Sequence, residues 1–379
     1  MTIIKYDITQ SLNSIKREDW QILCEDHPTL NYDFLKAMHD SGSVSPKTGW
    51  AMLYLSAWAD QRCVGAIPCY LKSHSYGEYV FDWAWAEAYE QIGQPYYPKL
   101  LMAIPFTPVT GPRILGRENT IRQQLVDRLL ALESDSNLSS IHCLFPREED
   151  CDLLLHKGFL TREGVQFHWH NQQYQNFDDF LATMSHDKRK KIKQERKKVQ
   201  AQGITFNWLT GREITEEHWR FFAQCYRHTY QAHSSTPYLN HDFFTHYHQS
   251  GLPECCLIVA YEAGQMIACA LNLFNQERAF GRYWGAIKYV PGLHFETCYY
   301  QSIEFCIHHA IGVFEGGAQG EHKLARGLSP VRTQSLHHLR DQRFQQAVED
   351  FLIREGKHIE HYHSELNEHA PFKKTSPTN

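Results

Sequence analysis

The 379-residue chain has no run of eighteen or more apolar residues, so no segment of it is expected to span a membrane. Its first ten residues, MTIIKYDITQ, lack the basic-then-apolar pattern of a secretory signal. None of its eleven cysteines are spaced as CxxC, and no HExxH pattern accompanies its 24 histidines. These absences predict a cytoplasmic protein whose cysteines are reduced core residues and which holds no metal ion.

The composition does allow a large folded core, because 42% of the residues are hydrophobic and 13% are aromatic. The length favours two domains. The formal net charge of -5 is unevenly distributed, since residues 188–198 read KRKKIKQERKK, with eight basic side chains and one acidic one. That segment carries +7 and the rest of the chain about -12, so a basic stripe is expected on an acidic body.

Two parts of the chain share one pattern at an offset of about two hundred residues. Apolar runs at 52–56 and 64–71 are separated by a short polar turn, and runs at 256–261 and 266–274 repeat this arrangement. Both pairs are typical of β-hairpins. A repeat this long indicates two copies of a domain.

The segments that follow each hairpin are also similar. The first half continues as an extended run at 104–109, a glycine-bearing loop, an amphipathic helix at 120–132 and a strand at 141–145. The second continues as a strand at 282–287, a loop, a helix at 297–310 and a strand at 312–315. Two helices, 177–202 and 216–232, are expected between the copies, and the residues after 361 are expected to form a frayed tail. This order predicts an α/β fold with domains at 1–172, 173–250 and 251–379.

The strand–loop–helix–strand order resembles the GNAT acetyltransferase fold, and its tandem arrangement resembles the FemABX peptidyltransferases. Four segments are similar to the FemAB-like predicted N-acyltransferases, a family linked with peptidoglycan biosynthesis: 70–85, 105–113, 188–198 and 317–327. The resemblance implies tandem GNAT-like halves with mixed sheets, joined through a basic helical insertion. It also implies transfer of an acyl or aminoacyl group from acyl-CoA or aminoacyl-tRNA to an amine-bearing acceptor, such as a peptidoglycan precursor. No tightly bound cofactor is expected.

Two loops are candidates for binding the pyrophosphate of coenzyme A. Arg113 and Gly116 partly match the acetyltransferase pattern Q/R-x-x-G-x-G/A, in which backbone N–H groups at a helix N-terminus face the phosphates. Glu118 replaces the final small residue of that pattern and brings a carboxylate. Pro291 and Gly292 occupy the equivalent place in the second half and match less of it. An ordinary helix entry explains either loop equally well.

The segment 314–323 is the strongest candidate for catalysis, because its glycines allow a close approach of backbone to ligand. Glu321 and His322 offer a general base, and Lys323 and Arg326 offer cations for an anionic donor or substrate. The alternative is a glycine-rich connection that carries solvated charges.

His294 and Glu296 lie at a strand-to-helix junction and are further catalytic candidates. Glu296 would also favour the start of a helix through its charge alone. Tyr283, on the strand that precedes this junction, is a candidate for binding substrate.

Residues 70–85 alternate in polarity, as a half-buried strand does. Four of their polar side chains are candidates for lining a substrate groove: Lys72, His74, Glu78 and Asp82. A strand with a polar outer face accounts for the same alternation.

The basic helix has two interpretations. Lys190 and Lys193, with their basic neighbours, form a face that suits tRNA, other nucleic acid or the pyrophosphate of a lipid-linked precursor. An exposed helix that is simply well solvated has the same composition. For the whole chain, the competing hypothesis is a non-catalytic GNAT-like module that binds nucleic acid or a cell-wall precursor. The incomplete phosphate loops favour that module, whereas Glu321 and His322 favour an enzyme, because a binding module has no need of a base.

Overall fold

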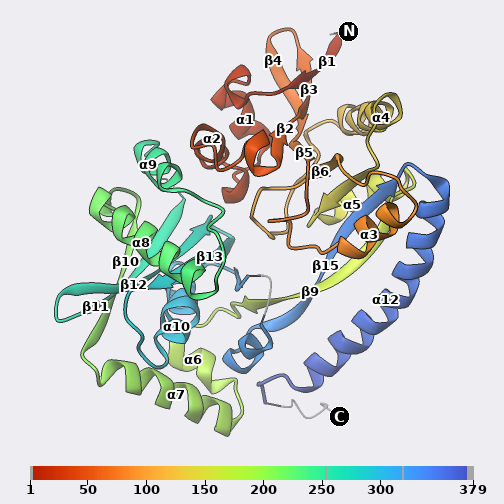
Figure 1. Ribbon diagram of the computed structural model, residues 1–379. Helices are drawn as coiled ribbons and strands as arrows, with labels where there is room; N and C mark the ends of the chain where they lie inside the picture. Colours follow the sequence, from red (N-terminus) through yellow and green to blue (C-terminus); the bar gives the residue numbers. More distant parts are fainter. Residues whose placement is uncertain (1–2, 252–253, 318–319, 374–379) are drawn as a thin grey trace. The chain divides into compact units, whose positions relative to one another are not determined.

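The computed structural model describes residues 3–251, 254–317 and 320–373 (Figure 1). The chain divides into two compact units: unit 1 comprises Met1–Gly164 and Arg332–His361, and unit 2 comprises Val165–Val331 and Tyr362–Asn379. Two strands, β9 (Leu160–His170) and β15 (Ser329–Leu339), run from one unit into the other. The units therefore divide the chain differently from the ranges expected from sequence. The helical segment 173–250 belongs wholly to unit 2, and 332–361 returns to unit 1 because β15 pairs there with β8 (Ser140–Leu144).

Unit 1 contains two groups of strands. The antiparallel order β1-β3-β4-β7 joins four strands: Ile4–Thr9, Tyr54–Ala59, Arg62–Ile67 and Leu115–Gly116. The order β2-β5-β6-β8-β15 is mixed, since β6 pairs with β8 in parallel and the other pairs are antiparallel; its remaining strands are Trp50–Met52, Cys69–Lys72 and Lys99–Met102. The helices of unit 1 are α1 (Arg17–Leu23), α2 (Tyr32–Asp40), α3 (Trp83–Gln91), α4 (Asn119–Asp135), α5 (Glu148–Leu155) and most of α12 (Gln342–Glu368). Leu125 and Leu129 of α4 are fully buried in the core between helix and strands.

Unit 2 is built on the order β10-β11-β12-β13-β14-β9, in which only β13 and β14 pair in parallel. These strands are Ile204–Thr210, Cys255–Glu262, Gln265–Phe274, Arg278–Ala286 and Val313–Glu315, followed by the unit 2 part of β9. The helices are α6 (Phe177–Ala182), α7 (His186–Gln200), α8 (Glu216–Ala232), α9 (His241–Gln249), α10 (Leu293–Phe295) and α11 (Gln301–His308). Helix α8 packs against β12 and β13 (Figure 1). Mixed sheets flanked by helices in both units confirm the predicted α/β class.

Both predicted hairpins are confirmed, as β3–β4 and β11–β12. Three expectations are wrong. The strand predicted over 70–85 ends at Lys72, and a loop then leads to α3. The helix predicted over 177–202 is interrupted between α6 and α7, where Met184 is fully buried. The part of the predicted frayed tail that the structure describes remains helical through Glu368, because Leu366 packs into the core of unit 2; residues 374–379 of that tail lie outside the described residues.

All eleven cysteines are free thiols, ten of them buried and Cys298 half-buried, as core residues should be. None of the described helices is long and apolar enough to cross a membrane. Within the described ranges, no three His, Cys, Asp or Glu side chains are grouped so that they could hold a metal ion.

Candidate functional site

The parallel strands β13 and β14 of unit 2 separate after a short pairing. Their register runs only from Arg278↔Val313 to Phe280↔Glu315. After these pairs, β13 continues to Ala286, whereas β14 ends at Glu315. Beyond Phe280, the edge of β13 that faced β14 is therefore outside the ladder. A strand edge of this kind presents backbone N–H and C=O groups that a ligand can bind.

Aromatic and imidazole side chains gather beside this edge. The rings of Trp284 on β13 and His294 on α10 are 5.1 Å apart, and His294 is 5.6 Å from the ring of Tyr299. The hydroxyl of Tyr299 lies 3.0 Å from Nε2 of His322. Phe295 completes the group, with its ring 5.6 Å from that of His322. Two predicted residues far apart in sequence, His294 and His322, are thus brought together.

The imidazoles in this group are held neutral at pH 7. Burial lowers the pKa of His294 to about 4, and the neighbouring His322, Arg326 and Lys323 add to the effect. Burial also lowers the pKa of His322, with further contributions from Arg326 and Lys323. Burial raises the pKa of Tyr299. The His322–Tyr299 pair therefore combines a neutral imidazole with a protonated phenol.

The predicted cations Lys323 and Arg326 lie in the same group, on the 3₁₀ segment Glu321–Arg326. Lys323 is 3% exposed and its Nζ donates to the carbonyl of Gly317 at 2.8 Å. Burial lowers the pKa of Lys323 to about 8. The guanidinium of Arg326 lies 3.4 Å from the centroid of the Phe295 ring and bonds to the carbonyl of His322 at 2.7 Å.

The helix beside this group contains a π-helical turn, Glu296–Tyr300, between α10 and α11. Such turns are rare and occur frequently at functional sites. Here the turn supplies both Tyr299 and the half-buried Cys298.

The structure places Glu321 and Glu296 apart from this group. Glu321 is exposed and accepts a hydrogen bond of 2.8 Å from the hydroxyl of Tyr362, on α12. Glu296 is 1% exposed and is bonded by Arg196 of α7, at 3.0–3.2 Å, and by Gln301 at 2.8 Å. Glu296 therefore fastens α7 to the helix α10–α11. Among the predicted bases, His322 and His294 belong to this group.

The predicted phosphate loops have different surroundings. In unit 1, Arg113 is fully buried and its guanidinium donates to the carbonyls of Val109, Pro112 and Leu144, so this side chain organises the loop. Gly116 lines a cavity of about 960 Å³ that also contains Arg117, Arg122 and Arg147 among its lining residues.

In unit 2, Gly292 has φ 85° and precedes α10, and Pro291 is exposed. Tyr283 is buried against Tyr226 of α8, because alternate residues of β13 face opposite sides of the sheet. The side chain of Tyr283 thus packs on the face opposite to Trp284.

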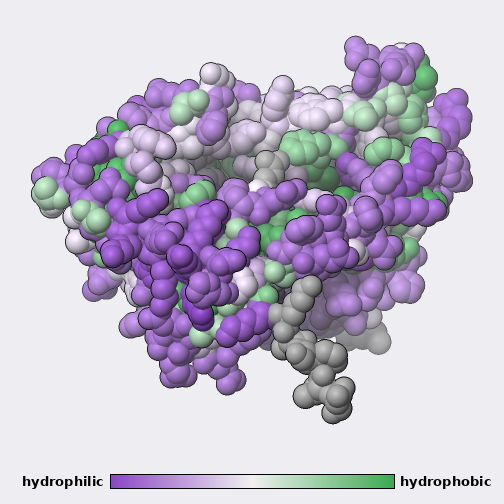
Figure 2. Space-filling model, turned by 90° about the horizontal axis from the view of Figure 1, so that it is seen from below, coloured by the Kyte–Doolittle hydropathy of each residue, from purple (hydrophilic) through white to green (hydrophobic). Residues whose placement is uncertain are grey.

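Helix α7 presents a basic outer face. Its exposed lysines are Lys190, Lys191, Lys193, Lys197 and Lys198. Of these, Lys193 pairs with Asp178 at 2.7 Å, whereas the other four make no ion pair with any described residue. Figure 2 views the molecule from the side on which α7 lies in Figure 1 and shows this region as predominantly hydrophilic. The inner face of α7 carries Ile192 and Val199 into the core.

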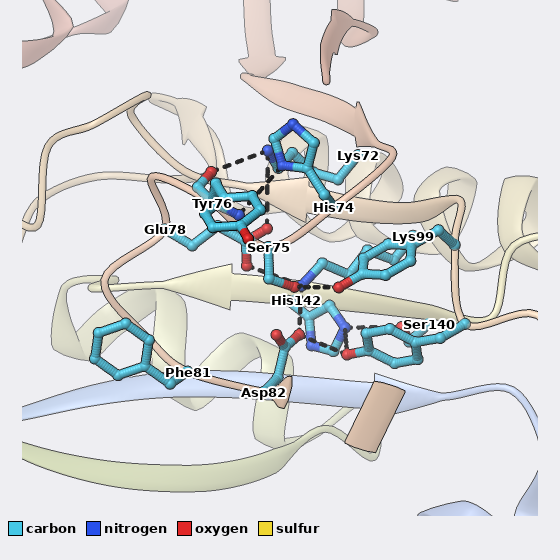
Figure 3. Close-up of polar contacts among 12 residues, drawn as sticks. Lys72, His74, Ser75, Tyr76, Glu78, Phe81, Asp82, Lys99, Ser140 and His142 are labelled. Atoms are coloured by element: carbon cyan, nitrogen blue, oxygen red, sulfur yellow. Dashed lines mark hydrogen bonds and ion pairs between the residues drawn. The ribbon is translucent and has the colours of Figure 1, made fainter. Parts of the chain in front are cut away.

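A second cluster of charged side chains is buried in unit 1 (Figure 3). Nζ of Lys99 donates to Ser75 and Glu78, each at 2.8 Å, and to Asp82. Lys72 is fully buried over the ring of Trp50, with its Nζ 3.7 Å from the ring centroid and 3.9 Å from Oε1 of Glu78.

The predicted side chains of this segment thus split into two groups. Lys72, Glu78 and Asp82 converge in the cluster, on the inner side of the loop that replaces the predicted strand. His74 lies closer to the surface, where its Nδ1 accepts from the backbone N–H of Tyr76 at 3.2 Å.

The hydrogen bonds of the cluster continue into the core of unit 1. The hydroxyl of Tyr96 donates to Asp82 at 2.6 Å and lies 3.1 Å from Nε2 of His142, whose Nδ1 is 2.7 Å from Nδ1 of His337. Oε1 of Glu78 and Oδ1 of Asp82 are buried without a hydrogen bond among the described residues.

Burial and pairing set the charge states of the cluster. Burial lowers the pKa of Lys72 to about 7 and raises that of Glu78 to about 7. Burial would also lower the pKa of Lys99, but the carboxylates of Glu78 and Asp82 outweigh it and raise that pKa. Charges this costly to bury are often kept for function, because they rarely improve stability over a well-packed apolar core.

Sequence reasoning missed several members of both groups. Tyr299, Lys99, Tyr96 and His142 read as ordinary helix or strand residues, because nothing local marks them. Glu195 was the exception, because a single acidic residue within the basic stripe indicates a specific partner. It bonds to Tyr300 and pairs with Arg326 at 3.3 Å, and so connects α7 to the candidate site.

The four segments that carry the family resemblance assemble in pairs. In unit 1, a Cβ placed at Gly77 would lie 2.6 Å from the ring of Phe106, so 70–85 and 105–113 are in contact. In unit 2, Glu195 and Arg326 join 188–198 to 317–327.

Among curated proteins, none matches this chain in sequence. Among solved structures, FemX is 11% identical, with a TM-score of 0.54 over 90% of this chain and 100% of that chain. L-PGS from Bacillus licheniformis is also 11% identical, with a TM-score of 0.52 over 85% of this chain and 95% of that chain. At this identity both comparisons establish a common fold. The model of the FemAB-like family, which is described as acting in peptidoglycan biosynthesis/recognition, matches residues 11–374, and the chain belongs to that family.

Proposed function

We propose that this protein is an N-acyltransferase that moves an acyl or aminoacyl group to an amine, and that the reaction takes place in unit 2. The observation that carries the proposal is the separation of β13 and β14 beside the His322–Tyr299 pair and the buried ammonium of Lys323. Membership of the FemAB-like family supports an acceptor that belongs to peptidoglycan or its precursors.

The side chains present suit each stage of the transfer. A protonated acceptor amine first loses a proton, which the neutral ring of His322 can take. The free amine then attacks the carbonyl of the donor ester or thioester, and in this proposal the ammonium of Lys323 stabilises the negative charge on the carbonyl oxygen. When the tetrahedral intermediate collapses, the bond from the carbonyl carbon to the leaving oxygen or sulfur breaks, and the leaving group takes from the His322–Tyr299 pair the proton that His322 removed from the amine. The nitrogen loses its second proton to solvent, and a neutral amide remains.

The outer face of α7 favours aminoacyl-tRNA over acyl-CoA as the donor. Four lysines without ion-pair partners among the described residues form a surface for several phosphates of a polyanion: Lys190, Lys191, Lys197 and Lys198. The predicted phosphate loop of unit 1 also departs from the coenzyme A pattern, since Glu118 replaces its final small residue and the guanidinium of Arg113 donates to backbone carbonyls.

The same departure favours a second candidate, a non-catalytic module that binds nucleic acid or a cell-wall precursor. Such a module would use the cations but not the neutral imidazoles.

Calorimetric titration of the purified protein with coenzyme A, acetyl-CoA and aminoacyl-tRNA separates these possibilities. We expect tRNA to bind with an affinity that falls steeply as salt rises, and coenzyme A to bind weakly or not at all. Micromolar binding of acetyl-CoA would instead make a thioester the donor. His322→Ala should then lower turnover by about 10²–10⁴-fold while leaving donor affinity unchanged. Loss of donor affinity alone would favour the binding module.

A further inference from the structure

The loop between β5 and α3 of unit 1 carries exposed aromatic side chains. Tyr76 is 59% exposed, and Trp83, at the start of α3, is 40% exposed. Their ring centroids lie 5.1 Å apart, and the ring of His74 lies 5.2 Å from that of Tyr76. Apolar groups that gather at the surface in this way indicate a binding surface, because covering them removes apolar area from water.

The buried charges of Figure 3 hold this loop from its inner side. Nζ of Lys72 donates to the backbone carbonyl of Tyr76 at 3.4 Å, and Nζ of Lys99 donates to three side chains of the loop. From β9, Arg162 donates to the backbone carbonyl of Phe81 at 2.7 Å. A ligand that binds the exposed rings therefore has little loop ordering to offset, and its affinity benefits accordingly.

The two adjoining rings also have free polar groups. The hydroxyl of Tyr76 and the indole N–H of Trp83 make no hydrogen bond with any residue that the structure describes. The surface thus combines apolar ring faces with hydrogen-bond donors at the ring edges. A ligand that matches it has C–H groups on one face and polar groups around its rim. A sugar ring has this chemistry.

The charges near this surface disfavour an anionic ligand. Residues 73–90 contain neither lysine nor arginine, and the exposed charges on α3 are two glutamates. Burial, with a smaller effect of Lys72, lowers the pKa of His74, so its ring is neutral at pH 7. Lys47 is exposed two positions before Gly49, against which His74 packs, but one cation contributes little to the binding of a polyanion. An uncharged saccharide therefore fits better than nucleic acid or an anionic lipid surface.

We propose that Tyr76 and Trp83, with His74 beside them, bind an N-acetylated sugar ring of a glycan. The C–H face of the sugar packs on the exposed rings, and its polar rim accepts hydrogen bonds from the hydroxyl of Tyr76 and the indole N–H of Trp83. The choice of an N-acetylated sugar rests on the proposed function, since peptidoglycan is a polymer of such sugars. The site itself lies in unit 1, apart from the residues assigned to the transfer in unit 2.

Titration calorimetry of the full chain with chitotriose, an oligomer of N-acetylglucosamine, tests the proposal. Maltotriose, which has no acetamido groups, should bind at least about tenfold more weakly. Trp83→Ala and Tyr76→Ala should each weaken chitotriose binding about tenfold, whereas Tyr76→Phe keeps the ring and should weaken it less. The matched control is Tyr289→Ala in unit 2, with unchanged binding, because Tyr289 is 89% exposed and stands outside this surface.

The proposal would be overturned if chitotriose did not bind, if maltotriose bound equally well, or if both alanine variants kept the wild-type affinity. Sedimentation with phosphatidylcholine vesicles tests the other occupant. Vesicle binding that Trp83→Ala abolishes, without chitotriose binding, would replace the sugar with a membrane surface. These measurements need no acyl donor, so a failure to bind sugar and a failure to transfer an acyl group are observed separately.

Discussion

The hydroxyl of Tyr299 lies 3.0 Å from Nε2 of His322, although the two residues stand on a π-helical turn and a 3₁₀ segment more than twenty positions apart. This contact joins the helix that follows β13 to the segment that follows β14. These are the two strands whose pairing ends at Phe280 and Glu315.

We predict that His322→Ala lowers kcat by about 10²–10⁴-fold, the usual contribution of a general base. Tyr299→Phe should lower kcat less, because it removes the partner of the base and leaves the base itself. Glu321→Gln is the matched control and should change kcat by less than about threefold, since Glu321 is exposed and bonded to Tyr362. Single-turnover rates measure the effect of all three substitutions. An equal loss of rate in Glu321→Gln would identify Glu321 as the general base.

Lys323→Met should stabilise the protein while it removes activity. Burial lowers the pKa of Lys323 from 10.5 to about 8, so the folded state binds fewer protons than the unfolded state between these values. Lys323 thus opposes folding below pH 8, by about 3 kcal/mol, and this cost disappears as pH rises from 8 to 10.5. Denaturant unfolding at pH 7 and pH 10 should show a gain in the variant at pH 7 that shrinks at pH 10. A gain equal at both pH values would contradict this assignment.

Replacing Lys190, Lys191, Lys197 and Lys198 of α7 with glutamine should weaken tRNA binding at low salt. The slope of log K against log salt should become shallower by about three, because up to four phosphate contacts are lost. Fluorescence anisotropy across a salt series measures both effects. Thermal unfolding should be almost unchanged, since these lysines are exposed.

Arg196→Gln, on the same helix, is the contrasting variant. It should lower the free energy of unfolding by about 3–5 kcal/mol, because the buried carboxylate of Glu296 would lose its main cationic partner. If Arg196→Gln unfolded no more easily than the wild-type chain, the pairing of α7 with Glu296 would be wrong.

The buried lysines of unit 1 should respond oppositely to the same substitution. Lys99→Met should destabilise the protein by about 3–5 kcal/mol, because Glu78 and Asp82 would be left buried without their shared cation. Lys72→Met should be neutral or stabilising at pH 7, since the ammonium of Lys72 makes one long hydrogen bond, 3.4 Å to Tyr76, and has a pKa lowered by burial. Chemical denaturation of the two variants side by side decides the point, and an equal loss in both would contradict it.

The pH dependence of stability should separate the two groups that titrate near neutrality in this cluster. The raised pKa of Glu78 makes its contribution decline as pH rises from 4.5 to about 7. The lowered pKa of Lys72 makes its contribution increase as pH rises from about 7 to 10.5. Glu78→Gln should remove the first slope and Lys72→Met the second, which unfolding free energies from pH 4.5 to pH 10 would measure. A profile unchanged in both variants would rule out these assignments.

The sequence by itself determined the elements whose signal is local. Both hairpins follow from apolar runs around short turns, and α8 begins and ends where its periodicity predicts, at Glu216 and Ala232. The alternating polarity of residues 70–85 led to a wrong strand prediction, because their polar side chains turn inward and accept hydrogen bonds from the ammonium of Lys99. A buried ion pair overrides a local strand pattern when the cost of leaving the charge unpaired is larger than strand propensity.

The candidate site was only partly accessible from sequence. His322, Lys323 and Arg326 were identified as candidates because glycines, histidines and cations are uncommon together in one short segment. Only the tertiary structure placed His294 beside His322 and assigned Glu296 to Arg196. It alone brought in Tyr299 and Glu195, and left Glu321 at the surface. Composition and periodicity report what a residue can do, whereas hydrogen-bond partners and burial, which decide its protonation and its role, depend on segments that meet only when the chain is folded.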